Sequence, residues 1–177
     1  MGTETWYRKF KLEQPLDELL VFSKARMSSY PCHSNADHKL LDKNSRYWDW
    51  PTREIEAPCV QSLLLHLEHK HHLPVNTPKT RIALWEYGKG DLLPPHTDVN
   101  ISLSATVVIS LVGDFETRAH EEKNNDEIIG RVVYGPGDYI ILNNTVVRHS
   151  GKPLSDYRLA MVVFIDPDHN MSDFWRD

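Results

Sequence analysis

The chain has 177 residues, of which 40% are hydrophobic and 25% are charged, and its formal net charge is −5. This length is enough for a buried core, so we expect a single domain over residues 1–177. The acidic balance argues against nucleic-acid binding by phosphate neutralisation, and no apolar run approaches membrane-spanning length. Because Cys32 and Cys59 suggest no disulfide framework, we expect a cytoplasmic protein with reduced cysteines. The sequence does not fix the oligomeric state.

The first part of the chain, residues 1–80, is expected to be a helix-rich support for the rest. Residues 16–25 form a predicted helix, with Pro15 near its first turn. A second predicted helix starts at Pro58 and continues through a leucine-rich run to about residue 71.

Between these helices, the polar and aromatic segment from about residue 37 to residue 53 is predicted to be a loop or a surface flap. It contains Trp48 and Trp50, which are either hydrophobic anchors or rings that gate a pocket. Two large rings need a surface to cover, and a pocket rim would serve. We therefore expect Trp50 to contact substrate as part of a lid.

From residue 80 onward the pattern changes to short β runs separated by glycine and proline. Strands this short and regular predict a mainly β fold with flanking helices, in which residues 81–166 form a barrel-like or jelly-roll double sheet. The predicted strands are residues 81–87, 101–111, 131–134, 139–142, 146–150 and 157–165.

One run indicates which way its strand faces. From residue 99 to residue 111 the odd positions are all apolar, whereas the even positions from 96 to 110 are almost all polar. Alternation of period two places these sets on opposite faces of a sheet. We expect the polar face to line the interior and the apolar face to be covered by the N-terminal helices.

The segment over residues 114–130 is charged and contains no apolar pair before Ile128-Ile129. It is predicted to be a mobile loop between strands. Together with the Trp48–Trp50 segment it is expected to form the lid.

Two histidines and an aspartate carry the predicted chemistry. His96, Asp98 and His149 supply two imidazoles and one carboxylate, the ligand set that holds non-haem Fe(II) and leaves positions open for other ligands. Arg158 lies in the apolar run 157–165, where a guanidinium is costly unless an anion pairs with it. A dicarboxylate cosubstrate beside the metal would be that anion.

Other interpretations of these residues stay open. His96, Asp98 and His149 are also compatible with ordinary polar positions on a β surface. Arg158 has nearby candidates for a structural ion pair, namely Asp138, Asp156 and Asp166. A further group on the second helix, His66, His69, His71 and His72, resembles a metal cluster, but we expect a solvated helix end.

Residues 87–98, with the sequence YGKGDLLPPHTD, resemble the Y-G-x-G-x-x-Y-x-P-H-x-D segment of prolyl-4-hydroxylase-like 2-oxoglutarate/Fe(II) dioxygenases. The later Gly137-Asp138, His149 and Arg158 follow in the same order as in that family. The resemblance covers roughly residues 80–166. It implies a double-stranded β-helix (jelly roll, cupin-like) as the catalytic core over residues 81–166, with the loop over residues 114–130 at the mouth of the active site. It also implies Fe(II), 2-oxoglutarate and O2 as cofactor and cosubstrates, with decarboxylation of 2-oxoglutarate to succinate.

The resemblance also implies roles for single residues. His96, Asp98 and His149 would be the catalytic metal ligands, and Arg158 would bind the far carboxylate of 2-oxoglutarate. Tyr87 would line the same cosubstrate pocket. The family's second tyrosine, which commonly donates to that carboxylate, is Leu93 here.

Because Leu93 cannot donate, another side chain must serve, and Ser110 and Thr106 on the polar face are the candidates. Trp85, on the same face of its predicted strand as Tyr87, is expected to form a substrate wall, and Arg148 is a further candidate substrate residue.

The expected reaction is hydroxylation of an unactivated C–H bond of a small molecule, such as an amino acid or a natural-product intermediate. A peptidyl, prolyl-type hydroxylase is the alternative, with nucleic acid and membranes not expected as partners. A second class also stays open, a non-catalytic jelly roll that binds metal or 2-oxoglutarate. Slow succinate formation without substrate would separate the two classes.

Overall fold

The computed structural model describes residues 5–32, 45–97, 105–121, 127–143, 148–166, 168 and 174–175. Its larger sheet consists of β1 (Tyr7–Lys11), β2 (Arg46–Pro51), β3 (Arg81–Gly88), β5 (Ala105–Val112), β8 (Asp138–Asn143) and β10 (Tyr157–Phe164). Its smaller sheet consists of β4 (Leu93–His96), β6 (Phe115–His120), β7 (Ile128–Tyr134) and β9 (Arg148–Pro153).

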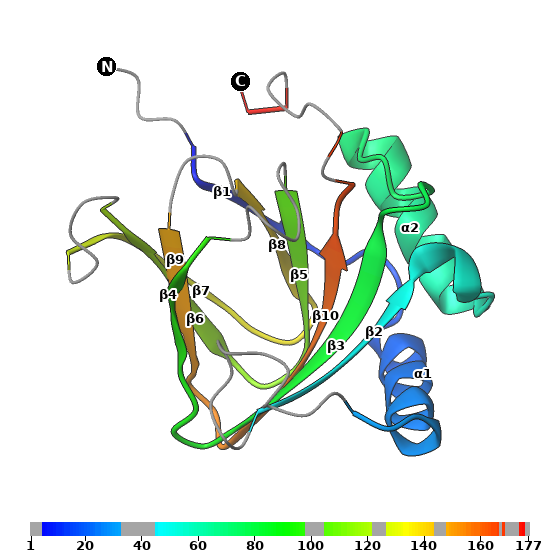
Figure 1. Ribbon diagram of the computed structural model, residues 1–177, viewed down its shortest axis with the longest axis horizontal. Helices are drawn as coiled ribbons and strands as arrows, with labels where there is room; N and C mark the ends of the chain where they lie inside the picture. Colours follow the sequence, from blue (N-terminus) through cyan, green and yellow to red (C-terminus); the bar gives the residue numbers. More distant parts are fainter. Residues whose placement is uncertain are drawn as a thin grey trace.

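The two sheets are antiparallel and form a sandwich (Figure 1). The strand order is β1-β8-β5-β10-β3-β2 in the larger sheet and β4-β9-β6-β7 in the smaller one. Two helices, α1 (Leu16–Ser29) and α2 (Pro58–His71), lie against the outer face of the larger sheet. The predicted mainly β jelly roll with flanking helices is confirmed.

The main hydrophobic core lies between the larger sheet and the helices. Helix α2 begins with Pro58, whose fixed φ suits the first helical position. Its buried side chains recur at helical spacing and pack into this core with Leu19 of α1. The odd residues of β5 face the same core, so the predicted apolar face of that strand is covered by the helices. These residues are Ala105, Val107, Ile109 and Leu111.

The predicted flap over residues 37–53 is wrong where the structure describes it. Residues 46–51 form β2, the edge strand of the larger sheet, which pairs with β3 along its whole length. Trp48 and Trp50 alternate with more exposed neighbours and point into the main core, where the Trp50 ring contacts Tyr30 of the α1 end. Residues 37–44 lie outside the described residues.

The predicted mobile loop over residues 114–130 is also wrong in its described parts. Phe115–His120 forms β6 and Ile128–Tyr134 forms β7, and the two strands pair with each other. Phe115, Thr117 and Ala119 are buried, whereas the residues between them are partly exposed. Residues 122–126 lie outside the described residues.

A second apolar cluster fills the space between the two sheets. It contains even-numbered residues of the larger sheet, such as Val108 and Leu142, and side chains of β6 and β7 from the smaller sheet. No helix within the described ranges is long and apolar enough to cross a membrane. The division into a support over residues 1–80 and a catalytic core over residues 81–166 stays a prediction, with β1 and β2 completing the larger sheet.

Candidate active site

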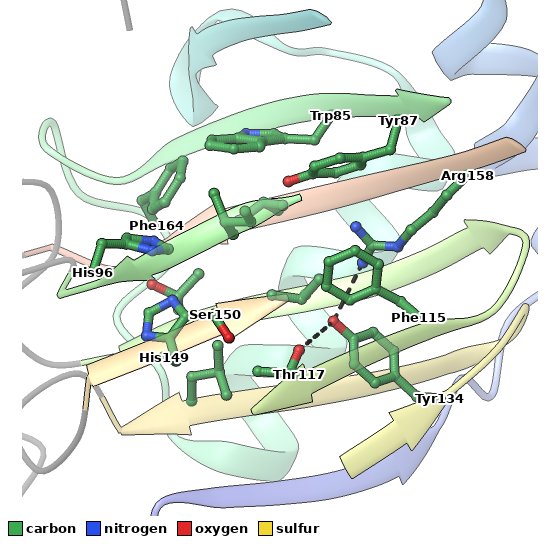
Figure 2. Close-up of a pocket in the computed structure, with 15 residues that line it drawn as sticks. Trp85, Tyr87, His96, Phe115, Thr117, Tyr134, His149, Ser150, Arg158 and Phe164 are labelled. Atoms are coloured by element: carbon green, nitrogen blue, oxygen red, sulfur yellow. Dashed lines mark hydrogen bonds between the residues drawn. The ribbon is translucent and has the colours of Figure 1, made fainter. Parts of the chain in front are cut away.

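A pocket lies between the two sheets, and both contribute to its walls (Figure 2). The larger sheet supplies Trp85, Tyr87, Thr106, Val108, Leu142, Arg158, Val162 and Phe164. The smaller sheet supplies Leu93, His96, Phe115, Thr117, Tyr134, His149 and Ser150. Most of this lining is apolar or aromatic, so the few polar groups in it are held in surroundings that weaken their contact with water.

The two histidines predicted as metal ligands meet at one end of this pocket. His96 on β4 lies directly opposite His149 on β9 in the strand register, and their ring centroids are 4.3 Å apart. Both residues are at least nine-tenths buried. Paired residues of antiparallel strands project from the same face, which explains why residues far apart in sequence come together here.

The tautomer of His96 follows from its backbone partner. Its Nδ1 lies 2.8 Å from the carbonyl oxygen of Pro94, which can only accept, so Nδ1 is the donor. In the neutral ring the lone pair is then on Nε2. Metal-ligating histidines are commonly oriented by such a second hydrogen bond.

Asp98, the predicted third ligand, lies outside the described residues. Within the part of the chain that the structure describes, no group of three His, Cys, Asp or Glu residues comes together as a metal site. The donor set that the described residues offer is therefore the two imidazoles.

Arg158 lies at the other end of the pocket, and its side chain points inward from β10 (Figure 2). It is only 2% exposed. Its Nη2 donates to the hydroxyl of Tyr134 at 3.2 Å, and its Cζ lies 3.5 Å from the centre of the Phe115 ring. Its Nε is buried without a hydrogen-bond partner.

No carboxylate among the described residues forms an ion pair with Arg158. Of the alternatives considered, Asp138 pairs with Lys9 and Lys11, and Asp156 pairs with Lys89. The guanidinium is instead surrounded by aromatic rings, with the Tyr87 ring 5.2 Å from its Cζ. A buried cation in these surroundings is well placed to receive an anion.

Tyr134 is a polar lining residue that the sequence analysis missed. Its hydroxyl lies 3.1 Å from the Thr117 hydroxyl as well as near Arg158, so β6, β7 and β10 meet at this oxygen (Figure 2). Burial raises the pKa of Tyr134, which keeps the hydroxyl protonated and able to donate. In the sequence, the feature that could have marked Tyr134 as a candidate was its position directly before the turn at residues 135–138.

Three predicted site residues lie elsewhere. Trp50 is in the main core on the opposite face of the larger sheet, so its predicted contact with substrate is wrong. Ser110 donates its hydroxyl to the carbonyl of Gly113 at 2.8 Å and does not line the pocket. Arg148 also lies outside the lining, and its Nη2 donates to the carbonyl of Pro95 at 3.0 Å.

Three others lie in the lining, namely Tyr87, Trp85 and Thr106. The rings of Trp85 and Tyr87 are stacked with centroids 6.1 Å apart, and Tyr87 continues toward Phe115 at 5.5 Å. These rings form a continuous aromatic wall along the pocket (Figure 2).

The prediction that the four histidines of the second helix form a solvated helix end is wrong in part. His69 and His72 are exposed, but His71 is buried and its Nε2 lies 2.7 Å from the hydroxyl of Tyr139, which His66 also approaches at 3.2 Å. Burial, followed by the nearby charge of Lys70, lowers the pKa of His71 to about 4. These residues lie on the helix-covered side of the larger sheet and do not line the pocket.

Comparisons with known proteins agree with this architecture. A Pseudomonas putida prolyl-4-hydroxylase has a similar structure, with a TM-score of 0.60 and 13% identity over 93% of this chain and 94% of that one. The non-haem alpha-ketoglutarate-dependent epimerase SnoN from nogalamycin biosynthesis has a TM-score of 0.65 and 13% identity over 90% of this chain and 77% of that one. No family model and no curated protein sequence matches the chain.

The chain therefore has the fold of 2-oxoglutarate/Fe(II)-dependent oxygenases. The resemblance predicted from the sequence motif is confirmed at the level of fold. At this identity the likeness does not transfer the activity of either protein.

Proposed function

We propose that the protein is an Fe(II)- and 2-oxoglutarate-dependent dioxygenase that hydroxylates an unactivated C–H bond of a small molecule and converts 2-oxoglutarate to succinate. One observation carries the proposal. Two buried histidines face each other at one end of an apolar pocket, and a buried arginine without a carboxylate partner among the described residues lies at the other end.

The two histidines fit an iron ion. Imidazole nitrogen suits Fe(II), and the hydrogen bond from Nδ1 of His96 to Pro94 presents the other ring nitrogen as a ligand. We assign Asp98 as the carboxylate ligand because it completes the two-histidine, one-carboxylate set that leaves positions open. When bound, the iron would supply the activation of oxygen and the oxidation of substrate.

Arg158 would bind the far carboxylate of 2-oxoglutarate. A guanidinium forms two parallel hydrogen bonds to a carboxylate, which fixes the orientation of the anion as well as its position. The surrounding rings exclude water, so this pairing is stronger than on a surface. Its unpartnered Nε and the Tyr134 hydroxyl add donor capacity at the same end of the pocket.

The substrate would lie along the aromatic wall that includes Trp85. Apolar and aromatic walls with few polar groups suit a small, partly apolar molecule. By excluding water, they also limit side reactions of the oxidising centre.

The test is succinate formation from 2-oxoglutarate by the Fe(II)-loaded protein under air. His96→Ala and His149→Ala should each abolish it, whereas His69→Ala, on the exposed face of α2, should leave it unchanged. Binding of 2-oxoglutarate without any succinate would instead favour the non-catalytic class. Unchanged succinate formation in His96→Ala or His149→Ala would refute the assignment of these two ligands.

A further inference from the structure

The position of Phe115 in the pocket has a consequence for cosubstrate selection. Its ring lies on the guanidinium of Arg158, with 3.5 Å from the ring centre to Cζ, which is van der Waals contact. A cation over the face of an aromatic ring is attracted to it, and the attraction grows when both groups are buried. On another side, Nη2 of Arg158 donates to the Tyr134 hydroxyl. The guanidinium is thus held in place from two directions.

Gly151 supports the ring from β9. A Cβ atom added at this glycine would overlap the Cε1 and Cζ atoms of Phe115. The ring therefore occupies space that exists only because residue 151 has no side chain. Gly151 lies opposite Thr117 of β6 in the register, so its position relative to Phe115 is fixed by strand pairing.

Gly151 therefore abuts the Cε1–Cζ edge of the Phe115 ring, whereas the face of the ring lies on Arg158. The ring cannot shift past Gly151 or closer to the guanidinium without moving a strand or Arg158, because packed interiors leave few voids. The face of the guanidinium that Phe115 covers is closed to an anion, so a carboxylate must approach through its remaining edge. The end wall of the pocket is therefore rigid.

We propose that Phe115, backed by Gly151, sets the length of the 2-oxo dicarboxylate that the pocket accepts. This inference rests on the proposed function, because the iron ligands hold the 2-oxo end of the acid and Arg158 holds the other. With both ends fixed, an acid longer by one methylene has to displace the Phe115 ring. Phe115 is thus a specificity-determining residue that acts through the position of Arg158.

A role in packing alone predicts a different result. If Phe115 only fills the space between the sheets, its replacement would lower stability and weaken all dicarboxylates alike. If it sets the length of the pocket, the ratio of affinities for two acids that differ by one methylene changes. That ratio is insensitive to a general loss of stability.

The experiment measures binding of 2-oxoglutarate and of 2-oxoadipate, which is longer by one methylene, to the Mn(II)-loaded protein by calorimetry. We expect the unaltered protein to prefer 2-oxoglutarate by about tenfold or more, the range for one misfitting methylene in a closed pocket. Phe115→Leu should weaken 2-oxoglutarate by about fivefold, through loss of the ring–cation contact, and should reduce the preference to about threefold or less. Phe10→Leu is the matched control and should keep the ratio, because Phe10 packs against the main core on the other side of the larger sheet.

Gly151→Ala supplies an independent arm. Its methyl group should displace the edge of the Phe115 ring and disturb the contact of the ring with Arg158. We expect 2-oxoglutarate binding to weaken by about tenfold or more, and Phe115→Leu in the same chain should restore most of that loss. Mn(II) affinity is measured in parallel, because residue 151 is close to His149 in sequence, and it should change by less than about twofold.

Different results would overturn the role of Phe115 and the proposed function. If the unaltered protein binds no 2-oxoglutarate, the proposed function is wrong. It is also wrong if the Arg158→Lys variant binds 2-oxoglutarate as tightly as the unaltered protein does. If binding depends on Arg158 but Phe115→Leu leaves the ratio unchanged, the length-setting role of Phe115 is overturned and the proposed function stands. If the Phe115→Leu variant does not fold, unchanged 2-oxoglutarate binding in the Gly151→Ala variant overturns the length-setting role of Phe115.

Discussion

Replacing Arg158 with methionine should make the protein more stable in the absence of 2-oxoglutarate. Arg158 is 2% exposed and has no carboxylate partner among the described residues. Burying a charge costs several kcal/mol in real proteins. This cost is partly offset by the contact with Phe115, which contributes about 2 kcal/mol, and by the hydrogen bond to Tyr134, which contributes about 1.5 kcal/mol. Methionine has a similar length and no charge, so the expected gain is about 1–3 kcal/mol.

Ligand should cancel or reverse this difference in stability. With metal present and 2-oxoglutarate at a hundred times its dissociation constant, the unaltered protein gains about 2.7 kcal/mol from binding. Arg158→Met cannot pair with the far carboxylate, so it should gain almost nothing. Urea unfolding followed by tryptophan fluorescence measures both states, because Trp48 and Trp50 are buried in the main core.

Arg131→Met is the control for removing an arginine from a strand. Arg131 is exposed on β7, so its replacement should change the free energy of unfolding by no more than about 0.5 kcal/mol. If Arg158→Met loses more than about 1 kcal/mol without ligand and responds to 2-oxoglutarate like the unaltered protein, the guanidinium is structural and the reasoning is refuted.

Three further outcomes are expected. Because the pKa of His71 is lowered to about 4 in the folded state, the unfolded chain takes up this proton first as the pH falls. Stability should therefore decline between about pH 6.5 and 4, by at most about 3 kcal/mol, and His71→Gln should lack this part of the slope in urea titrations. Trp50→Ala should lower the free energy of unfolding by about 3–5 kcal/mol, and the amount of product formed per succinate should stay constant. A fall in that ratio would instead support a role of Trp50 in a lid. Removing Fe(II) with a chelator should abolish both succinate formation and the stabilisation by 2-oxoglutarate, and added Fe(II) should restore both; stabilisation that survives chelation would contradict a metal-bound cosubstrate.

The sequence predicted the fold well where the hydrophobic pattern was strong. The alternation in β5 predicted that its odd residues would pack under the helices, and Val107 and Ile109 do so, whereas Thr106 lines the pocket. Helix α2 was predicted from its leucines and from Pro58 at its start. In both segments the local structural preference and the tertiary environment agree, so the secondary structure can be predicted from the sequence pattern.

The missed strands have weaker or mixed patterns. In β6 the inward residues are Phe115, Thr117 and Ala119, of which only the first is strongly apolar, so the charged residues between them dominated the interpretation. In β2 the buried Trp48 and Trp50 alternate correctly, but the polar residues around them suggested a loop. Strand preference depends on neighbouring strands, and a single sequence does not contain that information.

The candidate site was predictable only in part. The motif led to His96, His149 and Arg158, all of which lie in the pocket lining. Tyr134 and Phe115 were missed because their roles depend on the pairing of β6 with β7 and β9, which brings them to Arg158. The substitution of Leu93 for the family's tyrosine signalled that another donor was needed but not which strand would provide it.

The place of β10 in the larger sheet bears on how the chain folds during synthesis. Among the strands of the described residues, β10 is the last in sequence, yet it lies in the interior of the sheet, between β5 and β3. Until β10 has emerged from the ribosome, β3 and its neighbour β2 lack the strand that connects them to β5 in the sheet. Non-local pairing of this kind folds slowly and leaves apolar strand edges exposed meanwhile. The strand that carries Arg158 is therefore also the one that closes the sheet, so an unfinished chain lacks both the anion site and the sheet around it.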